Sequence, residues 1–331
     1  MHQQDLHSNV PGFNIANLKN NKRALFVLLG LIGGIIGAIA AENTPSFQFQ
    51  SNQTFISSQI ISALCLTTAW SAINAAFITL GLFIAGEIYN RKPPEGIIYL
   101  QTIFSGMLAG ALAGFIAETI FTLRGQPNPL LFALIRAGCW GIMGGLLGWK
   151  ISGTIPNMGR IRGLLAGTLG GCIGGMGFVV IGTVMPEFLG RILGIGTIGA
   201  ALGLAVVLVD EIFRVAQLEV LWSANEKTTV SLGSKPVYIG GGKDQIFVAG
   251  QPEHALAIIF ENGKIQRINP QNGKRVDLLD GTRIKVGKVE VTVRATGSKP
   301  TPKANNSVTT PAARTQPAAR TQASKDRTRV K

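Results

Sequence analysis

The sequence predicts an integral membrane protein in which a bundle of about six glycine-rich transmembrane helices precedes a small all-β sandwich and a basic tail. Three observations lead to this fold class. Only 15% of the 331 residues are charged and 42 are glycine, whereas soluble domains carry about 25% charged residues and about 7% glycine. Six long apolar runs follow one another, and after Arg214 short alternating segments replace them.

The apolar runs define a transmembrane region at residues 24–213, after an N-terminal segment at 1–23. Each run has about 18–27 residues and a helix rises about 1.5 Å per residue, so each run spans a hydrocarbon core of about 30 Å. The first run, with its basic flank and the small residues at 38–40, also resembles a signal peptide. Because it takes part in the repeat described below, we expect it to stay uncleaved. The runs are 24–41, 60–86, 97–123, 129–149, 163–185 and 192–213.

The loops between the runs differ in charge. Basic residues flank the first run and occupy the second and fourth loops, whereas the first loop, 42–59, has no Lys or Arg. By the positive-inside rule both termini are cytoplasmic, and an even number of helices requires that they share one side. The sequence therefore predicts a multi-pass protein of the plasma membrane, of the type found in the bacterial inner membrane. The basic flanking residues are Lys19, Lys22, Arg23, Arg91, Lys92, Lys150, Arg160 and Arg162.

Small residues recur at one spacing in the first, third and fifth helices, and more weakly in the others. The strong copies read small-x-x-small-small-x-x-small-small at 30–38, 106–114 and 167–175. The membrane region therefore reads as three copies of a two-helix hairpin. Small residues three and four apart form a groove where a second backbone approaches closely; a symmetric pore or an oligomerisation seam is the alternative. The residues expected to pack are Gly30, Gly34, Gly37, Gly106, Gly110, Gly114, Gly145, Gly167, Gly171, Gly174 and Gly199.

No motif indicates an enzyme. The three cysteines, Cys65, Cys139 and Cys172, fall in apolar runs, so neither a disulfide framework nor a metal cluster is expected. The string at 194–199 matches a dinucleotide-binding motif, but it begins a membrane span and does not follow a strand. We therefore expect no catalytic residue, no cofactor and no metal.

Ionisable residues at membrane depth often mark transport sites because they are costly in lipid. The deepest ones here are Glu118 and Arg136, on consecutive helices near the same end of the bundle. They are a candidate intramembrane pair, and two independent interfacial groups are the alternative.

Residues 217–296 are predicted to form a β-sandwich. Asn-Gly or Asp-Gly dipeptides at 262–263, 272–273 and 280–281 mark tight turns between alternating segments. The expected strands are 218–222, 228–232, 236–239, 246–249, 255–260, 264–268, 282–286 and 289–294.

This region resembles a forkhead-associated domain, a two-sheet fold that is similar to that of SMAD domains. Residues 218–222 and 237–240 are similar to the family's first strands and its Ile-Gly-Arg turn. The pair at 254–255 is similar to the His-Ala of its Ser-Arg-x-His-Ala motif, and 278–287 to its closing hairpin. The resemblance implies a module that binds a protein partner.

The departures from the family affect its phosphate contacts. The resemblance places the family's phosphothreonine-binding Arg at Gly241 and its Ser at Gln251, and neither replacement offers a comparable donor. It implies that the fold is kept, that phosphothreonine binding is lost, and that His254 is structural. Restoring Arg at 241 and Ser at 251 should recover some binding if the backbone is shared. The candidates for binding an acidic partner are Lys243, Asn272, Lys274 and Arg275, although Asn272 also suits a turn.

The tail, 297–331, should be disordered because it has no apolar periodicity. From 298 onward it holds eight Lys or Arg and one acid, so it is either a solubilising extension or a contact for anionic lipid. The preferred function is a non-enzymatic membrane scaffold whose degenerate module binds a cytoplasmic protein. The alternative is a small channel or transporter that the module regulates.

Overall fold

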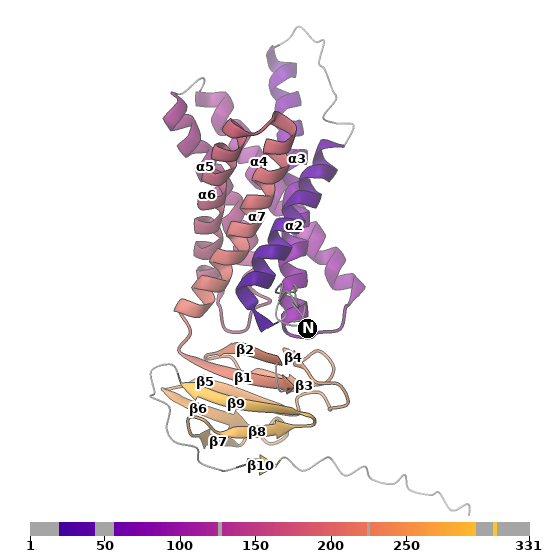
Figure 1. Cartoon of the computed structure of the whole chain (residues 1–331), viewed down its shortest axis with the longest axis vertical. Helices are drawn as coiled ribbons and strands as arrows, with labels where there is room; N and C mark the ends of the chain where they lie inside the picture. Colours follow the sequence, from indigo (N-terminus) through magenta and orange to yellow (C-terminus); the bar gives the residue numbers. More distant parts are fainter. Residues whose placement is uncertain (1–19, 44–55, 125–127, 224–225, 296–306, 310–331) are drawn as a thin grey trace, which may run out of the picture.

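The computed structural model describes residues 20–43, 56–124, 128–223, 226–295 and 307–309. Six long helices are followed by two β-sheets that lie at one end of the helical bundle (Figure 1). Each helix is long and apolar enough to cross a membrane, as the six runs predicted. The helices are α2 (Lys22–Glu42), α3 (Ile56–Tyr89), α4 (Gly96–Arg124), α5 (Pro129–Ser152), α6 (Arg160–Val184) and α7 (Glu187–Ile212).

Several helices extend past their apolar runs, and two of the six begin at a side-chain cap that satisfies a first-turn amide. The Asn21 side chain accepts a hydrogen bond from the Ala24 backbone N–H at 3.1 Å. Asn128 accepts one from the Leu131 backbone N–H at 2.7 Å, and Pro129 occupies the first turn. The apolar runs thus locate the helices, and in α2 and α5 a side-chain cap marks the start of the helix.

The bundle has three central and three outer helices. Helices α3, α5 and α7 contact one another, and α2, α4 and α6 each lie between two of them. Helix α2 packs against both α3 and α7, so the last of the six described helices lies against the first of them. The start of α2 and the end of α7 lie beside the β-sheets (Figure 1). We call this the module end of the bundle, and the opposite one the far end.

Glycines of the outer helices meet the backbone of a central helix at three crossing points of similar geometry. A Cβ added at each glycine would approach a neighbouring carbonyl oxygen more closely than nearly all side chains do, so glycine permits the contact. An added Cβ would lie 2.2 Å from the Gly199 carbonyl oxygen at Gly30, 3.0 Å from that of Ala75 at Gly106, and 2.0 Å from that of Gly144 at Gly167. One turn further along each outer helix, the corresponding distances are 2.5 Å from Gly34 to the Ile195 carbonyl oxygen, 2.4 Å from Gly110 to that of Ser71, and 2.3 Å from Gly171 to that of Trp140.

The four other glycines expected to pack also lie against a neighbouring helix. An added Cβ would lie 3.1 Å from Phe77 at Gly37, 2.7 Å from Ser71 at Gly114, 2.5 Å from Thr168 at Gly145 and 2.7 Å from Ile198 at Gly174. All eleven positions therefore lie at helix–helix contacts.

A second row of contacts occurs in two of the outer helices and is altered in the third. A Cβ at Gly33 of α2 would lie 2.5 Å from the Phe77 carbonyl oxygen, and one at Gly170 of α6 would lie 2.9 Å from the Ala201 carbonyl oxygen. The same place in α4 is Ala109, whose Cβ excludes an equally close approach. Of the neighbouring helix pairs, α4 and α5 accordingly contact each other least.

Large apolar side chains fill the half of the bundle at the module end. Phe26, Ile78, Leu82, Leu147 and Leu202 are at most 1% exposed and belong to one hydrophobic cluster. The centre of this half is closed by side chains.

The β module contains two five-stranded sheets, ordered β10-β8-β9-β1-β2 and β4-β3-β5-β6-β7, around one apolar core. Strands β2 and β4 are the edges near the bundle, and β7 and β10 are the remote edges (Figure 1). The strands are β1 (Ala216–Ser223), β2 (Glu226–Leu232), β3 (Val237–Gly240), β4 (Ile246–Phe247), β5 (Leu256–Glu261), β6 (Lys264–Ile268), β7 (Arg275–Leu278), β8 (Arg283–Val286), β9 (Val289–Ala295) and β10 (Ser307–Thr309).

Two of these strands were not predicted. The residues of β7 are mostly exposed, so the strand lacks the alternation by which strands are recognised. Strand β10 pairs in parallel with β8, so the tail is not structureless at Ser307–Thr309. The rest of the tail, like residues 1–19, lies outside the described residues.

Candidate functional site

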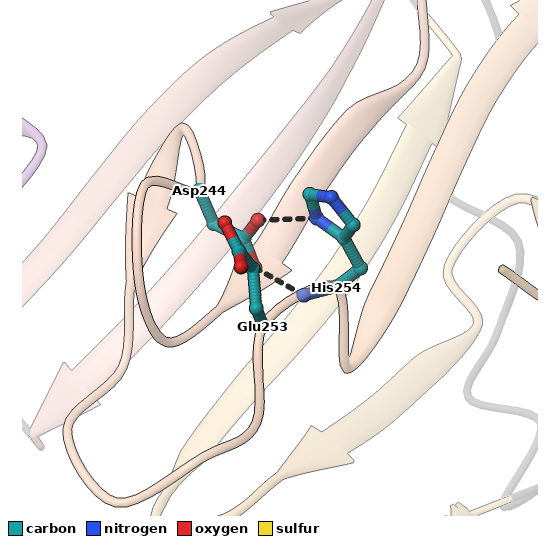
Figure 2. A group of neighbouring side chains, drawn as sticks. All are labelled: Asp244, Glu253 and His254. Carbon is teal, nitrogen blue, oxygen red and sulfur yellow. Dashed lines mark hydrogen bonds and ion pairs between the residues drawn. The ribbon is translucent and has the colours of Figure 1, made fainter.

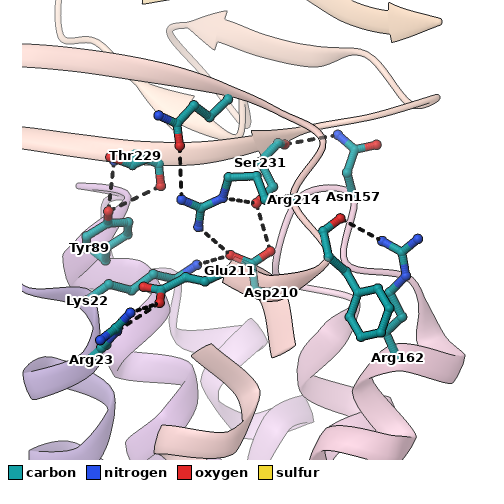
Figure 3. A network of polar contacts seen from close by, with 12 residues as sticks. Lys22, Arg23, Tyr89, Asn157, Arg162, Asp210, Glu211, Arg214, Thr229 and Ser231 are labelled. Atoms are coloured by element: carbon teal, nitrogen blue, oxygen red, sulfur yellow. Dashed lines mark hydrogen bonds and ion pairs between the residues drawn. The ribbon is translucent and has the colours of Figure 1, made fainter. Parts of the chain in front are cut away.

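A buried carboxylate joins the bundle to the β module. The Asp210 side chain near the end of α7 is 2% exposed and lies between two cations: Lys22 Nζ at 2.8 Å and Arg214 Nη2 at 3.0 Å. Its other oxygen accepts a hydrogen bond from Ser231 Oγ of β2 at 2.8 Å, and Arg214 Nε donates to the same hydroxyl at 2.9 Å (Figure 3). Each buried charge therefore has an opposite charge and a hydrogen bond, which a buried ion pair requires.

Tyr89 and Asn157 attach β2 and the segment after it to two further parts of the bundle. The Tyr89 hydroxyl at the end of α3 accepts from the Thr229 backbone N–H at 2.8 Å and donates to the Thr229 carbonyl at 3.2 Å. Between α5 and α6, the Asn157 side chain accepts from the Lys235 backbone N–H at 3.0 Å and donates to the Lys235 and Ser231 carbonyls.

Two ion pairs lie at the margin of this contact. Arg91, after α3, pairs with Glu226 and stacks over Trp222 with its guanidinium carbon 4.7 Å from the ring centre. Arg23 pairs with Glu211, and the Arg23 side chain is 58% exposed. We call the whole contact, from Lys22 and Tyr89 to Asp210 and β2, the seam. It holds the module in one orientation on the bundle.

The sequence interpretation missed the seam. It singled out only Glu118 and Arg136 among the ionisable residues of the helices, because the apolar run of α7 gives no sign that α2 packs against it. The signal that could have revealed it is the acidic pair Asp210 and Glu211 at the end of the last apolar run, together with the basic pair Lys22 and Arg23 before the first.

His254 fixes the loop between β3 and β4. Its Nδ1 lies 2.5 Å from Asp244 Oδ1, and its backbone N–H donates to Asp244 Oδ2 at 2.8 Å (Figure 2). The His254 ring also packs on the Tyr238 ring, with ring centres 4.3 Å apart. The Glu253 carboxylate is the third member of this cluster, and the ligand atoms of Asp244, Glu253 and His254 lie within 4.8 Å of one another. The contacts between Asp244 and His254 brace the loop internally.

Gly241 and Gln251 lie in direct backbone contact. A Cβ added at Gly241 would lie 2.2 Å from the Gln251 carbonyl oxygen. The geometry argues against the expectation that Arg at position 241 would recover binding, because the Gln251 backbone would have to move before any side chain could fit there.

The four predicted partner-binding residues lie in two places. Lys243 faces the bundle, 3.9 Å from Glu95 in the loop between α3 and α4. Asn272, Lys274 and Arg275 lie at the turn into the remote strand β7, where the Asn272 side chain accepts from the Lys274 backbone N–H at 3.0 Å. Arg275 forms an ion pair with Glu261.

Polar side chains also hold β7 against β6. Gln266 donates to Asp277 at 2.7 Å and Lys264 pairs with it at 3.0 Å. These hydrogen bonds hold the pKa of the exposed Asp277 carboxyl below its usual value.

Glu118 and Arg136 line one cavity at the far end, but in the described part of the chain no ion pair joins them. Glu118 instead accepts a hydrogen bond from Thr67 Oγ1 at 2.8 Å. The Arg136 guanidinium lies over the Phe178 ring at 4.8 Å.

No family model, no curated protein and no solved structure matches this chain.

Proposed function

We propose that this protein is a non-enzymatic membrane scaffold that holds a β module at the cytoplasmic face and presents it to a protein partner. The seam around Asp210 carries the proposal. A module that bound its partner on a flexible tether would not need a buried ion cluster, which is costly to form. A fixed module offers its remote edge in one direction while its near edge is covered by the bundle.

The assignment of the module end to the cytoplasm rests on charge. Lys22, Arg91, Lys92, Lys150 and Arg160 all lie at helix ends beside the module, and the positive-inside rule places such residues in the cytoplasm. We propose that this membrane is a bacterial inner membrane or a plasma membrane.

Internal repetition accounts for the design of the bundle. Gly30, Gly106 and Gly167 hold equivalent places in the repeat and make equivalent crossings. We infer that the bundle consists of three copies of one hairpin.

The module is proposed to be a degenerate relative of the forkhead-associated fold. The loops after β3 and β6 emerge at the same end of their sheet, because β3 and β6 run in the same direction on either side of β5. The segment around Gln251 fills the place of the phosphate-binding Arg, so the partner is recognised without phosphothreonine. The turn at Asn272–Arg275 and strand β7 are the surface that remains accessible to an acidic partner.

The test uses the full-length protein, purified in mild detergent from the cells that make it, with bound proteins identified by mass spectrometry. The double variant Lys274→Glu with Arg275→Glu should lose a partner that the wild type retains. The matched control, Lys285→Glu with Lys288→Glu, makes the same charge change on the other sheet and should retain it. Equal retention by both variants would contradict the proposed surface.

A flux measurement tests the alternative function. Liposomes that contain the wild-type protein should release potassium and chloride no faster than empty liposomes, because large apolar side chains close the module half of the bundle. Flux that depends on the protein would favour the channel.

A further inference from the structure

A cavity of about 640 Å³ lies in the far half of the bundle, between α3, α4 and α5. Its volume falls within the range of about 300–1,000 Å³ that is usual for small-molecule sites. Thr67, Trp70, Glu118, Arg136, Trp140 and Phe178 are among its lining residues.

The altered copy of the repeat explains where this cavity occurs. In α2 and α6 the glycines of the second row bring the next helix to a distance at which a Cβ would overlap its backbone. Helix α4 has Ala109 and Ala113 at these places, so α5 cannot come as close. Ala113 lines the cavity. The two alanines in place of glycine therefore account for the wider separation of α4 from α5.

The cavity contains two charged side chains that do not neutralise each other. Glu42 and Arg191, which also line it, form an ion pair at 2.9 Å. By contrast, Arg136 has aromatic rings beside it, Phe178 at 4.8 Å and Phe132 at 5.8 Å. Within the described residues, no carboxylate lies within ion-pair distance of Arg136, and no cation within that distance of Glu118.

A charge at membrane depth is costly unless an opposite charge accompanies it. Arg136 on α5 therefore favours an anionic group, with its guanidinium able to form two parallel hydrogen bonds to phosphate oxygens. Glu118 on α4 favours an ammonium group. The rings of Trp70 and Trp140, with centres 6.1 Å apart, add faces that attract a cation.

We propose that this cavity binds a zwitterion that carries a phosphate and an ammonium group, with the phosphate at Arg136 and the ammonium at Glu118. Such a group is the headgroup of a zwitterionic phospholipid in the leaflet at the far end, or the same group on a small soluble molecule. The filled module half of the bundle makes the cavity a binding site that ends within the membrane.

The test is a titration of the full-length protein in dodecyl maltoside, followed by tryptophan fluorescence and calorimetry. The probes are O-phosphoethanolamine, dihexanoylphosphatidylethanolamine and dihexanoylglycerol. Saturable binding of O-phosphoethanolamine identifies a soluble zwitterion as sufficient, and binding of the phosphatidylethanolamine alone identifies the lipid. Binding of dihexanoylglycerol as tightly as the phospholipid, or no saturable binding of either phosphoethanolamine probe, would overturn the proposal.

Three variants and a control locate the site. Arg136→Gln and Glu118→Gln should each weaken binding about tenfold or more, since each removes a charge-assisted contact. Arg160→Gln, an equal change at the module end, should leave affinity unchanged. Ala117→Phe keeps both charges but fills the cavity, and it should abolish binding. Wild-type affinity in all three cavity variants would show that the ligand binds elsewhere.

A measurement on the unaltered cavity guards against misfolded variants. Cys139 lines the cavity, so a bound ligand should slow its alkylation in the variant Cys65→Ser with Cys172→Ser. An unchanged alkylation rate at a saturating probe concentration would contradict binding in this cavity.

Discussion

Asp210 combines, in one side chain, contacts to α2, to the segment after α7 and to β2. Removing its charge leaves Lys22 and Arg214, which are 10% and 12% exposed, without a carboxylate. Breaking a buried pair on one side typically costs about 3–5 kcal/mol. We therefore expect Asp210→Asn to lower the thermal unfolding midpoint in detergent and to speed hydrogen exchange in β2.

Its neighbour Glu211 supplies the matched control. Glu211 pairs with the more exposed Arg23, and surface pairs contribute about 0–1 kcal/mol. Glu211→Gln should therefore change stability little. Equal effects of the two substitutions would mean that burial of the Asp210 cluster contributes nothing to docking.

Gly241 decides whether the module can be given the family's chemistry. Because a Cβ there would meet the Gln251 carbonyl oxygen at 2.2 Å, Gly241→Arg should destabilise the module by about 1–3 kcal/mol or more. The double variant with Gln251→Ser should bind phosphorylated and unphosphorylated threonine peptides equally, as fluorescence anisotropy can measure. A preference for the phosphorylated peptide would show that the loop can move aside.

At this scale the sequence reveals residue types but not their neighbours. The replacements at Gly241 and Gln251 could be read from the resemblance, yet the contact between them depends on a loop path that no pattern specifies. Likewise, Glu118 and Arg136 were correctly placed near the same end of the bundle. Whether they pair depends on the spacing of α4 and α5, which two alanines in place of glycine increase.

At the scale of helices, the crossing glycines make a testable contrast. Gly34→Leu, Gly110→Leu and Gly171→Leu each place a side chain where a Cβ alone would lie within 2.5 Å of a neighbouring backbone. Each should destabilise the protein by about 1–3 kcal/mol or more, seen as a lower melting temperature in detergent.

Two glycines in the same membrane region serve as controls. A Cβ at Gly138 or Gly182 would meet no atom within 4 Å, so Gly138→Leu and Gly182→Leu should melt close to the wild type. If the crossing variants melted like these controls, the glycines would not be packing contacts.

The elements themselves were largely predictable. Long uniform apolar runs specify helices, and eight strands followed from alternation and Asn-Gly or Asp-Gly turns. Strand β7 was not predicted from the sequence, because Arg275 and Asp277 make polar contacts with β6 and its hairpin and no alternating apolar face marks the strand. The division into central and outer helices depends on tertiary packing, which periodicity alone does not specify.

For the whole molecule, the proposed orientation places the far end outside the cell. In a background in which Cys65, Cys139 and Cys172 are replaced by serine, a membrane-impermeant thiol reagent should label Glu187→Cys in intact cells. Glu187 is 84% exposed at the far end. Lys274→Cys in the module should react only after permeabilisation; the reverse pattern would invert the topology.

The return of α7 to α2 also imposes an order on biosynthesis. Lys22 and Asp210 are 188 residues apart, and translation at about 5–20 residues per second separates their synthesis by about 10–40 s. During that interval the glycine face of α2 that receives α7 has no partner in its own chain. Helix α7 therefore completes the packing of α2, and β2, which is synthesised after α7, then forms its hydrogen bond to Asp210. A chain that stalls before α7 therefore lacks the helix that covers this face of α2, so the N-terminal half is packed completely only after the C-terminal half has been made.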